Sequence, residues 1–174
     1  IGTPTSMHVR FKTDSSVVAS LFYGQTQGSL ALSLVDTAAT VEHEFVITGL
    51  SPFTKYFYQA KLGTTALTVA DSSFHFVTSP VTGSRQPIQI WAIGDFGKAN
   101  QPQIDTREAY LNYAGKKHTD AWIWLGDNAY YSGTDSEYQA ELFDMYPGMM
   151  RNVVTWPAPG NHDYVSVNLT THDG

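Results

Sequence analysis

The amino-acid sequence predicts two folds in series, an all-β sandwich followed by an alternating β-α-β-α-β unit. Short strand-like runs separated by turn residues recur through the first half of the 174-residue chain, as they do in sandwiches. In the second half, apolar runs typical of buried strands alternate with helical patterns. The polar, turn-forming residues 80–87 lie between them and predict a linker. We therefore expect a sandwich at residues 1–79 and an α/β unit at residues 88–174.

Net charge separates the same two halves. Residues 1–87 carry five basic and five acidic side chains, and residues 88–174 carry five basic and eleven acidic ones, so the net charge of −6 lies in the second half. A nucleic-acid partner would need a basic face, and no apolar run approaches the roughly 18 residues of a membrane-spanning helix. We therefore expect neither nucleic acid nor membrane as a partner. Because the chain has no cysteine, a metal site must use oxygen and imidazole ligands.

Six strands are predicted in the first half, where no helical period competes with the short apolar runs. They span residues 7–12, 17–23, 30–35, 41–50, 56–62 and 74–77. The histidines of this half, His8, His43 and His75, stand singly on these strands. Each is expected to be a structural or surface histidine rather than a ligand.

One turn in the first half has a recognisable pattern. Leu50, Pro52, Thr54 and Tyr56 form a Leu-x-Pro-x-Thr-x-Tyr series. It resembles the tyrosine corner of fibronectin type III domains, in which the tyrosine hydroxyl bonds back to upstream backbone. The resemblance implies a fibronectin type III-like sandwich at residues 1–79. The alternative is that Tyr56 is an ordinary half-buried strand aromatic.

Three strands and two helices are predicted in the second half, and each strand is followed by a glycine. The strands span residues 88–93, 121–125 and 153–158, and the helices span 103–117 and 135–145. Right-handed crossovers would make these strands parallel, with their carboxyl ends at one edge. Lys116 and Lys117 are expected in the last turn of the first helix, where their charge suits the helix dipole.

Chemistry-bearing residues follow the end of each predicted strand. The three motifs are Gly94-Asp95-Phe96-Gly97, Gly126-Asp127-Asn128-Ala129-Tyr130 and Gly160-Asn161-His162-Asp163. Ligands of open α/β sheets bind beyond the carboxyl ends of the strands, so Asp95, Asp127 and Asn161 should meet in one crevice. Their oxygen atoms suit iron, manganese, zinc or magnesium. One carboxylate with two oxygens can also bridge a pair of metals.

The three motifs resemble the first three of the five that define the calcineurin-like metallophosphoesterases. The Gly-Asp-x-x-Tyr form that ends at Tyr130 narrows the resemblance to the purple acid phosphatases, whose longer plant and bacterial members also carry a fibronectin-like module. The resemblance implies a secreted, periplasmic or extracellular hydrolase, an acid phosphatase acting on small-molecule phosphomonoesters. It further implies a dinuclear centre of Fe(III) with Zn(II), Mn(II) or Fe(II).

The resemblance also implies a role for each metal ligand. Asp95 would bind the ferric ion, and Asp127 would bridge both metals. Tyr130 would complete part of the ferric shell, and Asn161 would bind the divalent metal. A metal-bound hydroxide would then attack phosphorus in line.

The resemblance also implies catalytic roles for two further residues of the third motif. His162 would contact the phosphate and help the leaving group depart. Asp163 would bond to His162 and fix its tautomer, as an orienting carboxylate does.

Two motifs of the family, Val-x-x-His and Gly-His-x-His, do not occur in this sequence, and His172 stands outside their context. They would supply three further histidine ligands. We therefore expect residues 88–174 to be the first part of an incomplete catalytic domain, and the chain alone to be weak or inactive. The remainder would be its partner, in the same longer chain or in a second chain. A natural short homologue that lost metal binding is the other possibility.

A hypothesis of another class is a non-catalytic fibronectin-type binding module attached to a decayed phosphoesterase half. Two enzyme classes are disfavoured by missing motifs. Asp95-Phe96-Gly97 matches the kinase tripeptide, but no His-Arg-Asp loop or glycine-rich nucleotide loop accompanies it. A serine hydrolase would need Gly-x-Ser-x-Gly, which is absent.

Overall fold

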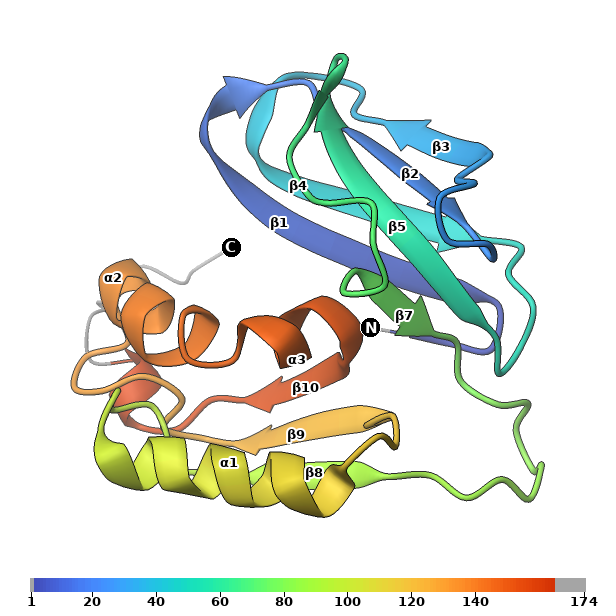
Figure 1. Cartoon of the computed structure of the whole chain (residues 1–174). Coiled ribbons are helices and arrows are strands. Elements are labelled where there is room, and N and C mark those ends of the chain that lie inside the picture. Colours follow the sequence, from blue (N-terminus) through green and yellow to red (C-terminus); the bar gives the residue numbers. More distant parts are fainter. Residues whose placement is uncertain (1, 165–174) are drawn as a thin grey trace, which may run out of the picture. The chain divides into compact units, whose positions relative to one another are not determined.

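The computed structural model describes residues 2–164 of the chain (Figure 1). The chain divides into two compact units, Ile1–Gln86 and Pro87–Gly174. The division falls inside the segment 80–87 that the sequence assigns to a linker. No helix in the part of the chain that the structure describes has the length and apolarity needed to cross a membrane.

The first unit contains two antiparallel sheets. One consists of β1 and β4, and the other has the order β3-β2-β5-β6 with β7 also paired to β5. The strands are β1 (Ser6–Val17), β2 (Ser20–Gly24), β3 (Leu32–Val35), β4 (Thr40–Thr48), β5 (Lys55–Leu62), β6 (Thr65–Ala66) and β7 (His75–Val77).

The predicted strand positions are confirmed in the first unit, with two differences. The short strand β6 was not predicted. Strand β1 continues to Val17, which the sequence pattern assigned to the following strand. The pairing of β1 with β4 shifts register between Lys12 and Val17. Such an irregularity lets a strand accommodate extra residues that alternation alone does not reveal.

The hydrogen bond expected of a tyrosine corner is confirmed. The Ser51 backbone N–H donates to the Tyr56 hydroxyl at 2.9 Å. Tyr56 is buried, and its ring stacks on Phe76 with centroids 5.5 Å apart. The bond therefore ties the turn before β5 to the core of the first unit.

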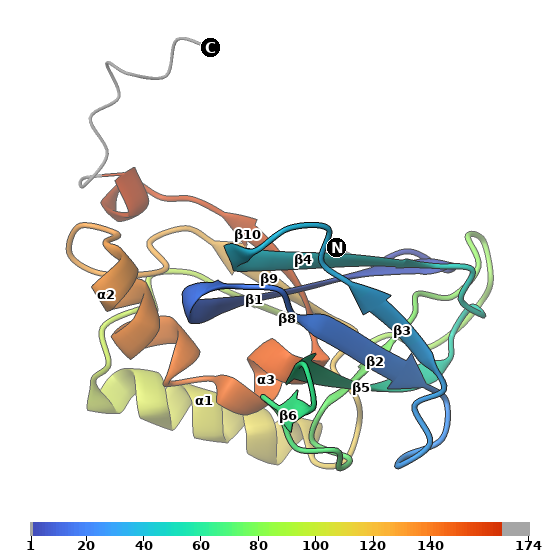
Figure 2. The ribbon, with the colours of Figure 1, turned by 90° about the horizontal axis from the view of Figure 1, so that it is seen from above.

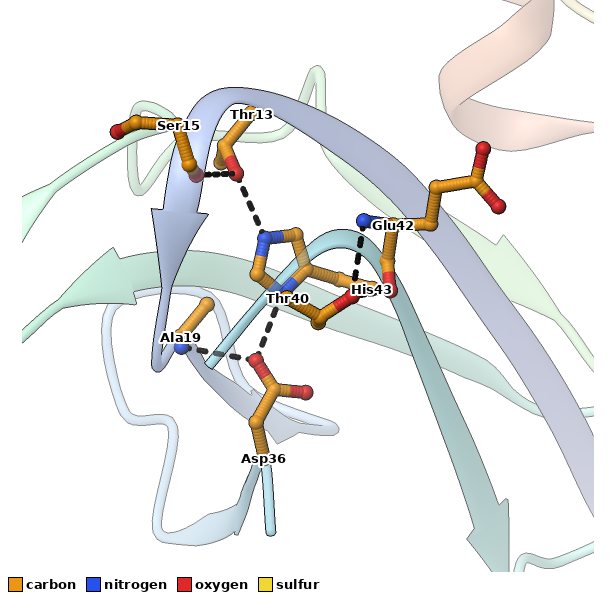
Figure 3. Close-up of polar contacts among 7 residues, drawn as sticks. All are labelled: Thr13, Ser15, Ala19, Asp36, Thr40, Glu42 and His43. Atoms are coloured by element: carbon orange, nitrogen blue, oxygen red, sulfur yellow. Dashed lines mark hydrogen bonds and ion pairs between the residues drawn. The ribbon is translucent and has the colours of Figure 1, made fainter. Parts of the chain in front are cut away.

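A buried polar cluster lies between β1 and β4 (Figure 3). We call Thr13, Asp36 and His43 the His43 cluster. Nδ1 of the fully buried His43 ring lies 2.6 Å from Asp36 Oδ2, and Nε2 lies 2.8 Å from Thr13 Oγ1. Asp36 also accepts a hydrogen bond from the Ala19 backbone N–H at 2.8 Å. The expectation of a structural histidine therefore agrees with the environment of His43.

The second unit contains a parallel sheet with the order β10-β9-β8, as the crossover argument predicts. Consecutive strands are neighbours, so right-handed crossovers carry both connecting segments to one face. The elements are β8 (Ile90–Ile93), α1 (Gln101–Ala114), β9 (Ala121–Leu125), α2 (Asp135–Tyr138), the π-helix η1 (Gln139–Phe143), α3 (Pro147–Asn152), β10 (Val154–Ala158) and the 3₁₀-helix η2 (His162–Tyr164).

Both predicted helices have different ends in the structure. Helix α1 ends at Ala114 because Gly115 takes a positive φ of 58° and caps it. Lys116 and Lys117 therefore lie beyond the last turn, and the prediction that they complement the helix dipole is wrong. The predicted helix 135–145 is interrupted as well, since α2 passes into the π-helix η1. Pro147 then begins the separate helix α3, a position where proline is tolerated.

Helix α1 and the segment η1–α3 lie side by side over one face of the sheet (Figure 2). The core beneath them is aromatic, with Trp122 fully buried against Trp91 and Tyr146. On the opposite face, Leu125 and Trp156 are 64% and 47% exposed. Parallel sheets are usually covered on both faces, whereas the described residues of the second unit cover only one.

Candidate metal centre

The two aspartates of the first two motifs stand directly beyond the ends of β8 and β9. Asp95 and Asp127 both have positive φ angles, 55° and 52°, a conformation that is uncommon for residues other than glycine. The Asp95 backbone N–H donates to the Gly126 carbonyl at 3.0 Å, which joins the two loops. Strained backbone of this kind gathers at functional sites because the surrounding structure must hold it in place.

Two glycines allow the loops to approach each other. A Cβ atom at Gly160 would collide with the Asp127 carboxylate, and one at Gly97 would collide with the Asn128 carbonyl. Glycine at these two positions therefore permits the close approach of the neighbouring loops.

Three side-chain oxygens meet beyond the strand ends. The Tyr130 hydroxyl lies 2.9 Å from Asp95 Oδ1 and 3.0 Å from Asp127 Oδ2. We call Asp95, Asp127 and Tyr130 the oxygen cluster. The structure thus brings together three of the four predicted metal ligands, although Asp95 is 35 residues from Tyr130 in sequence.

Electrostatics within the oxygen cluster favour protonated tyrosine beside ionised aspartate. Burial raises the pKa of the Tyr130 phenol, and its hydrogen bonds to the two carboxylates raise it further. The pKa of Asp127 is lowered, chiefly by the hydrogen bond from the His162 backbone N–H and further by the one from Tyr130. Two carboxylates therefore share the proton of one phenol.

The donor set of the oxygen cluster fits a hard cation. Carboxylate and phenolate oxygens are hard ligands, and a cation can replace the phenol proton between them. Three ligands do not complete a coordination shell, and no group of three His, Cys, Asp or Glu side chains gathers anywhere in residues 2–164. The residues present therefore fit a metal in part.

His162 lies beside the oxygen cluster. Its backbone N–H donates to Asp127 Oδ1 at 2.9 Å, and its ring centroid is 4.4 Å from that of Tyr130. Nδ1 lies 2.8 Å from the Tyr131 carbonyl oxygen, which can only accept, so Nδ1 carries a proton. The Tyr131 carbonyl therefore orients the imidazole, and the prediction that Asp163 does so is wrong.

Asp163 instead joins the loops that follow β9 and β10. Its buried carboxylate accepts from the Gly160 backbone at 2.7 Å, the Asn128 backbone at 3.0 Å and the Ala129 backbone at 3.3 Å. The Tyr138 hydroxyl donates to it at 2.8 Å, and burial, with this bond to the carboxylate, raises the pKa of Tyr138 to about 12. Asp163 is satisfied by backbone donors from both loops, so none of its bonds reaches the His162 ring.

The fourth predicted ligand stands apart. Asn161 follows β10 as expected, but its side chain is exposed and forms no hydrogen bond with the oxygen cluster within the described residues. Its role as a ligand of the second metal stays a prediction. His172 lies outside the described residues.

A second set of residues, which the sequence analysis missed, positions the oxygen cluster. Glu141 Oε2 accepts from the Tyr130 backbone N–H at 2.8 Å. The buried Gln103 donates from Nε2 to the Glu141 carbonyl at 2.7 Å, and its Oε1 accepts from the Lys98 backbone N–H at 2.9 Å. Gln103 and Glu141 therefore link the loop after β8 to the loop after β9. No sequence signal marks them, because the contacts join distant positions.

Glu137 also anchors the loop that carries Tyr130, and a sequence motif marks this residue. Its carboxylate accepts from the Tyr131 backbone N–H at 2.7 Å and the Thr134 backbone N–H at 2.9 Å. Thr134 and Glu137 form the capping box of α2, and the spacing Thr-x-x-Glu is its sequence signature. That signature could have identified Glu137 as an anchor of the loop that carries Tyr130.

Comparisons with known proteins agree with this geometry. Residues 88–173 match the family model of the calcineurin-like phosphoesterases. A solved structure of PhoD has a similar fold, with a TM-score of 0.65 and 13% sequence identity over 93% of this chain and 37% of that chain. This chain therefore spans little more than a third of the PhoD chain.

Two further comparisons add no support. The sensor domain of the anti-sigma factor RsgI4 from Pseudobacteroides cellulosolvens matches with a TM-score of 0.32 and 19% identity, over 46% of this chain and 86% of that one. No curated protein matches the chain. The family match covers all three motifs, and the two aspartates and the tyrosine that they contribute meet at the strand ends. The second half of the chain therefore carries a calcineurin-like metallophosphoesterase domain.

Proposed function

We propose that this chain is part of an acid phosphatase of the purple acid phosphatase type, which hydrolyses small phosphomonoesters at a dinuclear metal centre. The observation that carries the proposal is the oxygen cluster, in which Tyr130 contacts Asp95 and Asp127 at 2.9 and 3.0 Å. The family match supports the general class, a metal-dependent phosphoesterase. The tyrosine between two carboxylates supports the narrower type.

The metal ligands of the proposal divide between two ions. Asp95, Asp127 and Tyr130 would hold Fe(III), and Asp127 with Asn161 would hold Zn(II), Mn(II) or Fe(II). Bound there, the ions would supply an activated water and would neutralise negative charge on the phosphoryl oxygens. The chain spans 37% of the PhoD chain, and we propose that the missing histidine ligands come from the remainder of the catalytic domain, in the same longer chain or in a second one.

His162 would donate a proton to the leaving group. The Tyr131 carbonyl accepts the hydrogen bond from Nδ1, so this contact fixes the ring and leaves Nε2 as the nitrogen that can meet a substrate. A protonated Nε2 can donate to the leaving-group oxygen as the ester bond breaks. Asp163 would preserve this arrangement indirectly, because it holds the β9 and β10 loops together.

For the first unit we propose a fibronectin type III-like module that precedes the catalytic domain. The hydrogen bond from Ser51 to Tyr56 and the two antiparallel sheets support this assignment. The competing hypothesis, a binding module attached to a decayed phosphoesterase half, differs from our proposal in one measurable property, because it predicts no metal.

Iron content and visible absorption of the protein with its complete catalytic domain test the proposal. Wild-type protein should bind iron and show a tyrosinate-to-iron absorption band. Tyr130→Phe should lose that band and much of the iron. Tyr131→Phe is the matched control and should keep both, because Tyr131 lies outside the oxygen cluster. A colourless, iron-free wild-type protein would favour the non-catalytic hypothesis.

A further inference from the structure

A lysine lies next to the oxygen cluster, and neither the motifs nor the family match assigns it a role. Lys98 directly follows Gly94-Asp95-Phe96-Gly97. Its Nζ lies 4.2 Å from the centroid of the Tyr130 ring and 6.0 Å from that of Tyr131. A cation therefore stands over the ring of one member of the oxygen cluster.

The loop that carries Lys98 is fixed to the rest of the site. Gln103 Oε1 accepts from the Lys98 backbone N–H at 2.9 Å, while Gln103 Nε2 donates to the Glu141 carbonyl at 2.7 Å. Glu141 in turn accepts from the Tyr130 backbone N–H at 2.8 Å. The backbones of Lys98 and Tyr130 are therefore linked through a short chain of hydrogen bonds. This linkage fixes the two backbone positions from which the Lys98 and Tyr130 side chains extend.

Among residues 2–164 the Lys98 ammonium forms no salt bridge with a carboxylate, and Lys98 is exposed, with its Nζ over the Tyr130 ring. Asp95, Asp127 and Tyr130 would hold the cations, whose positive charge would then stand beside that of Lys98. An anion that binds at this place relieves the repulsion among these positive charges. The local charges therefore favour an anionic ligand that touches both the metal site and Lys98.

We propose that Lys98 is a substrate-binding residue that contacts the phosphoryl group and favours dianionic phosphomonoesters over monoanionic phosphodiesters. The inference rests on the proposed phosphoesterase function and adds to it a residue that would set the preference for monoesters over diesters. A point charge discriminates by total charge, because its attraction to a dianion is about twice its attraction to a monoanion at equal distance. A lysine ammonium is such a compact charge, suited to phosphate without a fixed bidentate geometry.

The test compares variants of the protein with its complete catalytic domain. Lys98→Met removes the charge and keeps the apolar stem, and Lys98→Arg keeps the charge. Lys116→Met is the matched control, since Lys116 lies beyond the far end of α1. Three quantities are measured for each variant: bound metal per chain, the dissociation constant of inorganic phosphate by calorimetry, and kcat/KM for a phosphomonoester and a phosphodiester with the same leaving group.

Lys98→Met should keep its metal and bind inorganic phosphate roughly tenfold more weakly, which corresponds to about 1.4 kcal/mol. Its kcat/KM should fall more for the monoester than for the diester. High salt should shrink the difference from wild type. Lys98→Arg should retain most of the phosphate affinity, and Lys116→Met should match wild type.

Two failures are distinguishable. If wild-type protein hydrolyses esters but Lys98→Met binds phosphate as wild type does, the inference about Lys98 is overturned and the proposed function stands. The inference is equally overturned if phosphate affinity falls only in proportion to lost metal, because Lys98 would then act on the metal site. If wild-type protein with bound metal neither binds phosphate nor hydrolyses either ester, the proposed function and the inference fall together.

Discussion

The two units each contain a cluster of ionisable side chains, and the clusters differ in how their charges are balanced. In the first unit, the His43 cluster pairs a fully buried imidazole with the Asp36 carboxylate at 2.6 Å. In the second unit, the oxygen cluster places the two carboxylates of Asp95 and Asp127 around one phenol. In the first cluster, the one carboxylate has a ring nitrogen as its partner. The second contains like charges, and a bound cation would balance them.

The surroundings of the two clusters differ in the same way. Both ring nitrogens of His43 have partners, and the ring is fully buried. In the oxygen cluster, by contrast, Asp95 is exposed and both aspartates have positive φ. A buried, paired cluster contributes to folding, whereas an open, strained cluster of like charges costs stability and is retained for what it binds. Titratable residues alone therefore do not identify a site.

The His43 cluster also has the residue types of a Thr-His-Asp hydrolytic triad, but its hydrogen bonds do not suit one. Thr13 Oγ1 donates to the Ser15 carbonyl at 2.9 Å (Figure 3). A nucleophile must give its proton to the histidine, and the Thr13 proton points elsewhere. We therefore interpret the His43 cluster as structural.

The largest loss of stability is expected when the buried ring of His43 is removed from the His43 cluster. His43→Ala leaves the largely buried Asp36 carboxylate without its ring partner, and leaving a buried group without its hydrogen-bond partner costs about 1–3 kcal/mol. The free energy of unfolding, measured by urea denaturation, should fall by about that amount. Metal content should not change, because the hydrogen bonds of the His43 cluster join residues of the first unit.

His8→Ala is the matched control for this prediction. His8 Nδ1 also contacts a carboxylate, Glu44, at 2.8 Å, but the His8 and Glu44 side chains are 29% and 42% exposed. Exposed pairs contribute about 0–1 kcal/mol. If both histidine variants lost equal stability, burial would not be what distinguishes the His43 cluster.

The second largest effect is expected when a substitution removes a negative charge from the oxygen cluster. Asp127→Asn in the protein with its complete catalytic domain should abolish metal binding and lower kcat/KM by roughly 10³-fold, because Asp127 is the proposed bridge between the metals. The stability of the metal-free protein should change little, as the amide retains part of the hydrogen bonding and one of two like charges is gone. Metal analysis, kinetics and urea denaturation measure the three quantities.

His162→Ala separates metal binding from chemistry at the same site. We expect this variant to keep its metal and to lose kcat by roughly 10²-fold, as removal of a proton donor does. Equal metal loss in the Asp127 and His162 variants would contradict the division between ligand and proton donor.

Sequence patterns predicted most of the fold because periodicity and glycine placement are local properties. Strand β9 at Ala121–Leu125 was predicted to the residue, since an apolar run followed by glycine is unambiguous. The interruption of the second helix was not predicted, because the π-helix at Gln139–Phe143 has no compositional signature. Its position depends on tertiary contacts such as that between Gln103 and Glu141.

In the site, too, some contacts could be predicted from the sequence and others could not. The meeting of Asp95 and Asp127 was predictable, because they stand at equivalent positions beyond parallel strands and topology brings such positions together. Tyr130 was expected beside them from the family resemblance alone. The partner of the His162 ring was not predictable, since the Tyr131 carbonyl is a backbone atom that no residue type indicates. Asp163 was given the wrong partner because proximity in sequence suggested His162, whereas its carboxylate takes the backbone donors of the loop after β9.

The smallest predicted effect tests whether the oxygen cluster depends on being held in position. Glu141 touches no predicted ligand oxygen, but its carboxylate accepts from the Tyr130 backbone N–H at 2.8 Å. Glu141→Ala should weaken iron binding about tenfold, the effect typical of residues that support metal ligands, and shift the tyrosinate-to-iron band. Glu141→Gln should restore both, because an amide oxygen accepts the same bond. Glu108→Ala on α1 is the control, since Glu108 pairs with its neighbour Arg107. If Glu141→Gln weakens iron binding as much as Glu141→Ala does, Glu141 acts through its charge and not through the hydrogen bond that it accepts from Tyr130. The oxygen cluster would then not depend on a positioning hydrogen bond, and this difference from the His43 cluster would disappear.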